Sequence, residues 1–203
     1  MTLERADAEQ LLRDGLRRLL EENYELFIGG ANERAITSLL AGYLKNDPRI
    51  PEGLSVDHEY NRLGLGYTKN LKVWIKGELL VNEYGNPIER PRIPDILVHG
   101  RGDNEDNLVA VEVKVDEFNN DGDKSKIWAL TSDPLAYQFG VLISILREES
   151  PDGPTWMPLW AWNPELGNTA VHYEPVFDEN TAVQLAANGR DEMAKRLKAR
   201  GLA

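Results

Sequence analysis

Hydrophobic and polar residues recur with two different periods along this chain, and the two periods predict both helices and strands. Between residues 3 and 22, leucines recur at helical spacing among arginines and glutamates, which predicts an amphipathic helix. The pair Gly29 and Gly30 interrupts the chain after that helix. A second apolar stripe runs from 32 to about 45, and Asn32 is a suitable capping residue for the helix that it predicts.

The remainder of the chain is richer in short apolar runs, which have the length of strands and are separated by polar turns. The polar segment 100–107 joins two of these runs and contains glycine, asparagine and aspartate, so it predicts an antiparallel hairpin. Residues 62–92 read as irregular, with a small hairpin around 73–81. The predicted strands cover residues 55–61, 93–99, 108–115, 139–146, 156–162 and 170–176.

Two further helices complete the predicted order of elements. A short helix spans 121–131, with Asp121 or Asp123 as its cap, and Asp178 caps a C-terminal helix that runs to about 200 with an interruption at Gly189. Helices that alternate with strands in this way predict an α/β fold with a mixed sheet flanked by helices. A length of 203 residues fits a single domain.

Composition narrows the class of protein. The chain has no cysteine, so disulfides and thiolate metal sites are excluded, and its three histidines lie too far apart to predict a zinc site. Its apolar runs are too short to span a bilayer, and its N-terminus lacks the pattern of a signal peptide. We therefore expect a cytoplasmic protein that does not enter a membrane.

The net charge of −11 bears directly on any partner that is itself acidic. Proteins that hold nucleic acid by neutralising phosphates usually present a basic face. An acidic total still allows a local basic patch, but it predicts weak and salt-sensitive binding, or a partner protein that supplies affinity or specificity.

The candidate chemistry lies on the predicted hairpin. Asp95 stands at the start of its first strand, and Glu112 and Lys114 share one face of its second strand because they are two residues apart. Two carboxylates and an ammonium group suit a hard divalent cation and a phosphate. Asp95 and Glu112 are the natural ligands of Mg²⁺ or Mn²⁺, with the Val113 carbonyl as a third. Lys114 could orient or deprotonate an attacking water, or stabilise charge on the phosphate.

These residues carry a resemblance to a known family. Pro94-Asp95 followed by Glu112-Val113-Lys114 resembles the signature of the PD-(D/E)xK nuclease superfamily. The segments 57–62, 123–124 and 137–140 resemble a group of small bacterial proteins with this nuclease core. The resemblance implies a restriction-endonuclease-like fold over about 31–146, in the order helix, three strands, helix, strand. The helix 3–22 and the strands and helix of 156–200 would then be additions to that core.

Two further residues are candidates for the catalytic site. The resemblance implies that Glu33, on the first core helix, joins the metal ligands; alternatively, it is a first-turn glutamate favoured by the helix dipole. Gln138, at the start of the strand 139–146, could contact a water or a phosphate, or could make an ordinary hydrogen bond at the strand start.

Basic residues that could contact nucleic acid gather before and after the hairpin, where aromatic residues accompany them. Exposed salt bridges and solvated lysines are the alternative interpretation, because acidic residues are interspersed. The candidates are Arg62, Lys69, Lys72, Arg90, Arg92 and, on the helix 121–131, Lys124 or Lys126.

The sequence therefore predicts a Mg²⁺- or Mn²⁺-dependent nuclease, with an endonuclease acting on DNA favoured and a homodimer implied by resemblance only. A second hypothesis is a catalytically inactive binding or regulatory module of nuclease fold within a larger complex. A third is a purely structural protein, in which Asp95, Glu112 and Lys114 would be exposed and far from one another.

Overall fold

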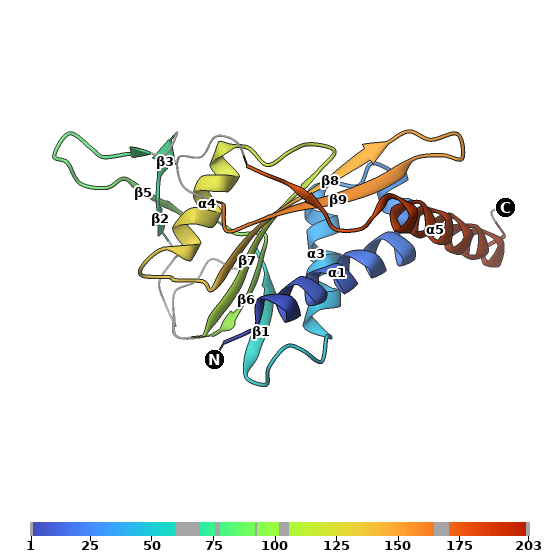
Figure 1. Ribbon diagram of the computed structural model, residues 1–203, viewed down its shortest axis with the longest axis horizontal. Helices are drawn as coiled ribbons and strands as arrows, with labels where there is room; N and C mark the ends of the chain where they lie inside the picture. The colour runs from blue at the N-terminus through green and yellow to red at the C-terminus, as the bar shows by residue number, and fades with distance from the viewer. Residues whose placement is uncertain are drawn as a thin grey trace.

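A mixed sheet of six strands forms the centre of the protein, and helices flank it (Figure 1). The computed structural model describes residues 2–59, 70–75, 78–91, 93–101, 106–164 and 171–201. The strands in their order across the sheet are β1 (Leu54–His58), β6 (Ile96–Gly100), β7 (Asn107–Val115), β8 (Phe139–Glu148), β9 (Thr155–Trp162) and β10 (Glu174–Pro175).

The predicted hairpin is confirmed, since β6 and β7 pair antiparallel with Ile96 opposite Val111. The next pair, β7 and β8, is parallel, with Glu112 opposite Leu142. A parallel pair needs a crossover connection, and the helix α4 (Asp121–Thr131) provides it. The other neighbours in the sheet pair antiparallel.

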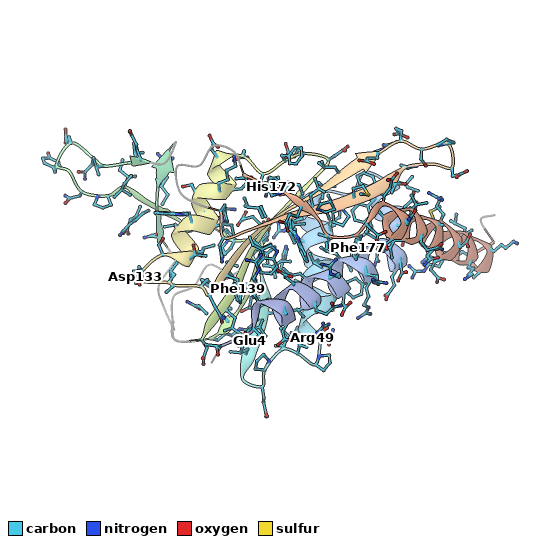
Figure 2. All side chains as sticks on the ribbon, viewed as in Figure 1. Glu4, Arg49, Asp133, Phe139, His172 and Phe177 are labelled. Atoms are coloured by element: carbon cyan, nitrogen blue, oxygen red, sulfur yellow. The ribbon has the colours of Figure 1, made fainter. Side chains whose placement is uncertain are left out.

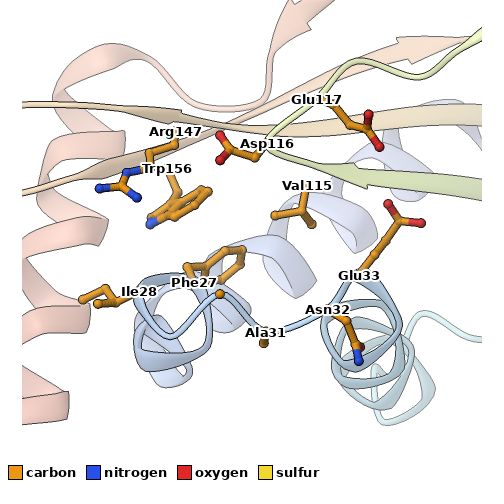
Figure 3. Close-up of a pocket in the computed structure, with 11 residues that line it drawn as sticks. Phe27, Ile28, Ala31, Asn32, Glu33, Val115, Asp116, Glu117, Arg147 and Trp156 are labelled. Atoms are coloured by element: carbon orange, nitrogen blue, oxygen red, sulfur yellow. The ribbon is translucent and has the colours of Figure 1, made fainter.

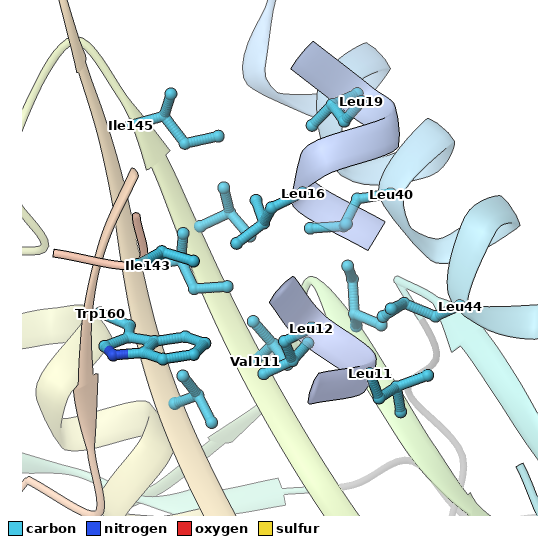
Figure 4. Packing of buried hydrophobic residues seen from close by; sticks show 14 of the residues in the cluster. Leu11, Leu12, Leu16, Leu19, Leu40, Leu44, Val111, Ile143, Ile145 and Trp160 are labelled. Atoms are coloured by element: carbon cyan, nitrogen blue, oxygen red, sulfur yellow. The ribbon is translucent and has the colours of Figure 1, made fainter. Parts of the chain in front are cut away.

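One face of the sheet is covered by α1 (Arg5–Glu22) and α3 (Glu33–Lys45). The apolar stripes of both helices are buried as their helical spacing predicts, with Leu16 and Leu40 packed in one cluster with Val111 and Ile143 of the sheet (Figure 4). Because the residues of β7 alternate between the two faces, its odd-numbered valines enter this cluster.

The C-terminal helix α5 (Glu179–Ala199) packs against α1 and the short helix α2 (Tyr24–Ile28). Phe177 lies just before α5, beside α1 (Figure 2), and the guanidinium groups of Arg13 and Arg17 lie 5.9 and 5.6 Å from its ring. Asp178 caps α5 as predicted, since its side chain accepts a hydrogen bond from the Thr181 amide.

The other face of the sheet carries α4 and the ribbon strands β2 (Asn70–Lys72) and β5 (Glu89–Pro91). Leu71 of the ribbon and Ile127 of α4 share a second core cluster with Leu97 and Leu142 of the sheet. The small hairpin expected near 73–81 is present, because β3 (Trp74–Ile75) pairs antiparallel with β4 (Glu78–Leu79).

Several local predictions need correction. Helix α2 was not expected, and Asn120 rather than Asp121 or Asp123 caps α4, with Asp123 completing a capping box. The strand expected at 170–176 is reduced to β10, and the strand expected at 55–61 covers 54–58, with residues 60 and 61 outside the described ones.

Helix α5 also continues through Gly189, where an interruption was expected. A Cβ at this position would lie 2.7 Å from the Leu20 carbonyl oxygen and 2.7 Å from the Tyr24 Cβ, so the glycine permits the close approach of α5 to the first two helices. None of the helices in the described segments has both the length and the apolar character required to cross a bilayer.

Candidate functional site

Asp95 and Glu112 lie together where the paired strands β6 and β7 place them. Asp95 directly precedes β6, and the backbone amide of Val113 donates to its Oδ2 atom over 2.8 Å. This bond holds the Asp95 carboxylate against β7 at Val113, the residue directly after Glu112. Burial raises the pKa of Asp95, which the hydrogen bond from Val113 opposes.

Glu112 is the most enclosed charge of the cluster, with 2% of its side chain exposed. Its Oε2 atom accepts a short hydrogen bond from Lys126 Nζ, whereas its Oε1 atom is buried and has no hydrogen-bond partner among the described residues. Burial raises the pKa of Glu112 well above its usual value; the neighbouring Asp95 carboxylate raises it further and Lys126 opposes both.

Lys114 forms an ion pair with Glu33 at the start of α3. Its Nζ atom lies 2.9 Å from Glu33 Oε1 and 3.2 Å from Oε2. Burial lowers the pKa of Lys114, but the bond to Glu33 and the negative charges of Asp123, Glu33 and Asp95 together outweigh burial, so the net pKa is raised. The pKa of Glu33 is also raised, because burial together with the carboxylates of Asp95 and Asp123 outweighs the contact with Lys114.

Glu112 and Lys114 lie two residues apart on β7 but contact different helices. The two residues share one face of the strand, but Glu112 bonds to Lys126 on α4 while Lys114 bonds to Glu33 on α3. Strand β7 therefore links the two helices through two separate ion pairs. For a purely structural protein, Asp95, Glu112 and Lys114 were expected to be exposed and far apart. In the structure Glu112 is buried, and Asp95 bonds to the residue next to it.

Two residues of the cluster have roles that were not expected from the sequence, which predicts Asp123 only as a helix cap and Lys126 only as a contact of the substrate backbone or a solvated lysine. Asp123 is 7% exposed, and its carboxylate contributes to raising the pKa of Glu33, Asp95 and Glu112. Both residues lie on α4, three positions apart, so they share one face of that helix. That spacing shows in the sequence that the two residues share a helix face, but not that this face meets Glu112.

Gln138 does not belong to the cluster. Its side-chain Oε1 atom accepts from the Leu3 amide over 3.0 Å, and its Nε2 atom donates to the Leu3 carbonyl over 2.5 Å. It lies four residues before Leu142, the partner of Glu112 on β8, which is about 13 Å along a strand. The ordinary hydrogen-bond alternative therefore describes Gln138, which ties the N-terminal segment to the sheet.

The predicted nucleic-acid contacts are only partly within the described residues. Lys72 and Arg90 are both exposed, but Lys72 pairs with Glu89 across the ribbon and Arg90 is opposite Leu71. Since directly paired residues share a face, Lys72 and Arg90 lie on opposite faces of the ribbon. Lys124 contacts Asp121 over 3.4 Å. Outside the described residues lie Arg62, Lys69 and Arg92.

A pocket of about 390 Å³ adjoins the cluster at Glu33 (Figure 3). Phe27 and Trp156 form an aromatic wall, with ring centroids 5.1 Å apart. Asp116 and Glu117, which follow β7, also line the pocket. Figure 3 shows the Glu33 carboxylate on the same side of the pocket as that of Glu117. Glu33 therefore both lines the pocket and forms the ion pair with Lys114.

The residues of the cluster suit a hard divalent cation. Carboxylate oxygens are the ligands that Mg²⁺ and Mn²⁺ prefer, and the unpartnered Oε1 atom of Glu112 leaves one such oxygen available. In the part of the chain that the structure describes, no three Asp, Glu or His side chains are placed to bind one ion. The cluster therefore suits a cation that is held by one or two carboxylates and retains several of its waters, as Mg²⁺ commonly does.

Comparison with models of protein families, with curated proteins and with solved structures gave no match for this chain.

Proposed function

We propose that the protein is a Mg²⁺- or Mn²⁺-dependent nuclease of the PD-(D/E)xK type with a restriction-endonuclease-like fold. The observation that carries this proposal is the hydrogen bond from the Val113 amide to Asp95, which sets that carboxylate beside Glu112 on the neighbouring strand. Lys114 follows two residues later on the same strand. DNA as the substrate, endonucleolytic cleavage and a homodimer rest on the resemblance alone.

In this proposal Asp95 and Glu112 hold the cation, and the Val113 carbonyl is a third candidate ligand. When bound, the cation polarises a phosphoryl oxygen and lowers the pKa of a coordinated water. The charges of the cluster support a divalent ion: when all are ionised, the four carboxylates exceed the two ammonium groups by two charges. These groups are Glu33, Asp95, Glu112, Asp123, Lys114 and Lys126.

The ion pair with Glu33 favours one role for Lys114 among those open to it. Because its pKa is raised, the ammonium group remains protonated at neutral pH, so it is suited to stabilise negative charge on the phosphate rather than to accept a proton from water. Glu33 acts through this contact: it fixes the position of the ammonium group, with Nζ 2.9 Å from its Oε1 atom.

The test is cleavage of plasmid, linear duplex, single-stranded DNA and RNA with Mg²⁺ or Mn²⁺. We expect the wild-type protein to cleave, and Asp95→Asn and Lys114→Met to lower the rate by about 100-fold or more. The first variant weakens a proposed ligand of the cation, and the second removes a positive charge that would stabilise the phosphate. Lys195→Ala is the control, since that side chain is 75% exposed on α5. Circular dichroism checks that the variants fold, and equal cleavage by wild type and both variants would refute the assignment.

A catalytically inactive module of the same fold is the second candidate. The observation that favours it is that Glu33 and Glu112 are each already neutralised by a lysine, in a chain whose net charge is −11. Titration calorimetry with Mn²⁺ separates the two candidates. Absence of binding at millimolar Mn²⁺, together with absence of cleavage, would favour the module acting within a larger complex.

A further inference from the structure

We propose that Lys126 is a built-in counter-ion that occupies the cation-binding side of Glu112 in the metal-free protein and leaves it when a divalent ion binds. Lys126 is then a positioning residue that sets the metal affinity of the site. This inference rests on the proposed function, because it concerns the same carboxylates.

The contacts of Lys126 place its ammonium group between the two strands that carry the proposed ligands. Its Nζ atom donates to Glu112 Oε2 on β7 and to the Ile93 carbonyl, over 3.2 Å, on the segment that leads to Asp95. Its side chain is 13% exposed. The same ammonium group also lowers the pKa of Asp95. It therefore acts on both carboxylates that would hold the cation.

An ammonium group and a divalent cation cannot share this position. Like charges repel strongly at contact distance, and the repulsion is only weakly screened where side chains are buried. Lysine carries its charge on a flexible four-carbon stem, so the group can move while α4 stays in place. Once displaced from Glu112, the ammonium group would remain tethered to α4, which packs against β7 and β8.

The two consequences of removing Lys126 have opposite signs, and this distinguishes the proposal from a merely structural ion pair. Without metal, the loss leaves Glu112 buried and unneutralised, so the metal-free protein is destabilised. With metal, the loss removes a competitor, so the cation binds more tightly. A structural ion pair would produce only the first effect.

The experiment measures the Kd for Mn²⁺ by titration calorimetry on Lys126→Met, which keeps the apolar stem and removes the charge. Lys124→Met is the matched control, because it removes the same charge from the same helix while its ammonium group contacts the exposed Asp121. We expect Lys126→Met to lower the Kd by about tenfold or more relative to the wild type, and Lys124→Met to change it by less than about threefold.

Thermal unfolding with and without Mn²⁺ provides a second measurement, which can still be made if the variant is less stable than the wild type. We expect Lys126→Met to have a lower Tm than the wild type without metal and a larger rise in Tm on adding Mn²⁺. Lys126→Arg keeps the charge, so its Kd should stay within about threefold of the wild type.

The outcomes separate this inference from the function on which it rests. If the wild type binds Mn²⁺ and Lys126→Met binds it equally or more weakly, the inference is overturned and the nuclease proposal stands. If neither protein binds Mn²⁺, both are overturned. Binding by Lys126→Met alone supports the inference and means that Lys126 closes the wild-type site.

Discussion

Glu112 carries a charge into a strand that is otherwise fit for burial, and its partner explains how the fold tolerates it. Its side chain is 2% exposed and is neutralised by Lys126 from α4. The sequence could indicate that Glu112 and Lys114 need partners, because they interrupt an apolar run. It could not indicate which ones, since the partners lie 14 and 81 positions away on two helices whose docking only the fold determines.

At the residue scale, the raised pKa of Glu112 predicts how stability depends on pH. The folded protein keeps a proton that the unfolded chain has released above about pH 4.3. The free energy of unfolding therefore falls as the pH rises from that value through the folded pKa, by about 1.4 kcal/mol for each unit of the shift. Chemical denaturation at pH 5, 6 and 7 in EDTA measures this fall, which should be smaller in Glu112→Gln.

The raised pKa values of Asp95 and Glu33 act in the same direction, so Glu112→Gln should reduce the fall without abolishing it. Glu149→Gln is the control, because this side chain is 70% exposed, and its pH dependence should match the wild type. A wild-type free energy of unfolding that rises over this pH range would contradict the burial of charge in the cluster.

At the scale of elements, the packing of α5 depends on the absence of a side chain at one position. Gly189→Ala would bring a methyl group to 2.7 Å from the Leu20 carbonyl oxygen, so α5 would have to move away from α1. We expect a loss of about 1–3 kcal/mol in the free energy of unfolding, typical of overpacking. Chemical denaturation monitored by circular dichroism measures it.

Gly42→Ala is the matched control, because this glycine also lies within a helix, α3, and nothing lies within 4 Å of the added Cβ. Here the helix propensity of alanine should dominate and raise the free energy of unfolding by up to about 1 kcal/mol. Equal effects of the two substitutions would contradict the tight contact of α5 with α1.

Helices and strands with a clear hydrophobic period were predictable from the sequence. Elements that are very short, or that form only by pairing with another strand, were not. The apolar stripes of α1 and α3 and the runs of β6 and β7 carry their own signal, so their boundaries are close to those expected. Strand β10 has two residues and exists through its pairing with β9, and the five residues of α2 are too few to show a period. Asn120 was missed as a cap because aspartates follow it directly.

At the scale of the whole molecule, a net charge of −11 limits how the protein can hold DNA. We expect binding to a 20-base-pair duplex in EDTA to be weaker than about 1 μM at physiological salt and to weaken further as salt rises. Replacing EDTA with Ca²⁺ should strengthen binding, because the cation neutralises carboxylates in the cluster. Fluorescence anisotropy with labelled duplex measures both effects.

Nanomolar binding in EDTA that is insensitive to salt would contradict this expectation and would require a basic surface of the protein. Within the described residues, Lys72 and Arg90 do not form one, since they lie on opposite faces of the ribbon. The prediction of nucleic-acid contacts rests on residue types, whereas strand register decides which way those side chains point, and register depends on long-range pairing.

The order of the cluster along the chain has a consequence for biosynthesis. Glu33, Asp95 and Glu112 leave the ribosome before Lys126, and a chain made from its N-terminus at about 5–20 residues per second exposes these carboxylates first. Until α4 has emerged and docked, Glu112 lacks the partner that it has in the folded protein, Lys126. Synthesis of α4 is therefore the step after which the growing chain can pair Glu112 with Lys126.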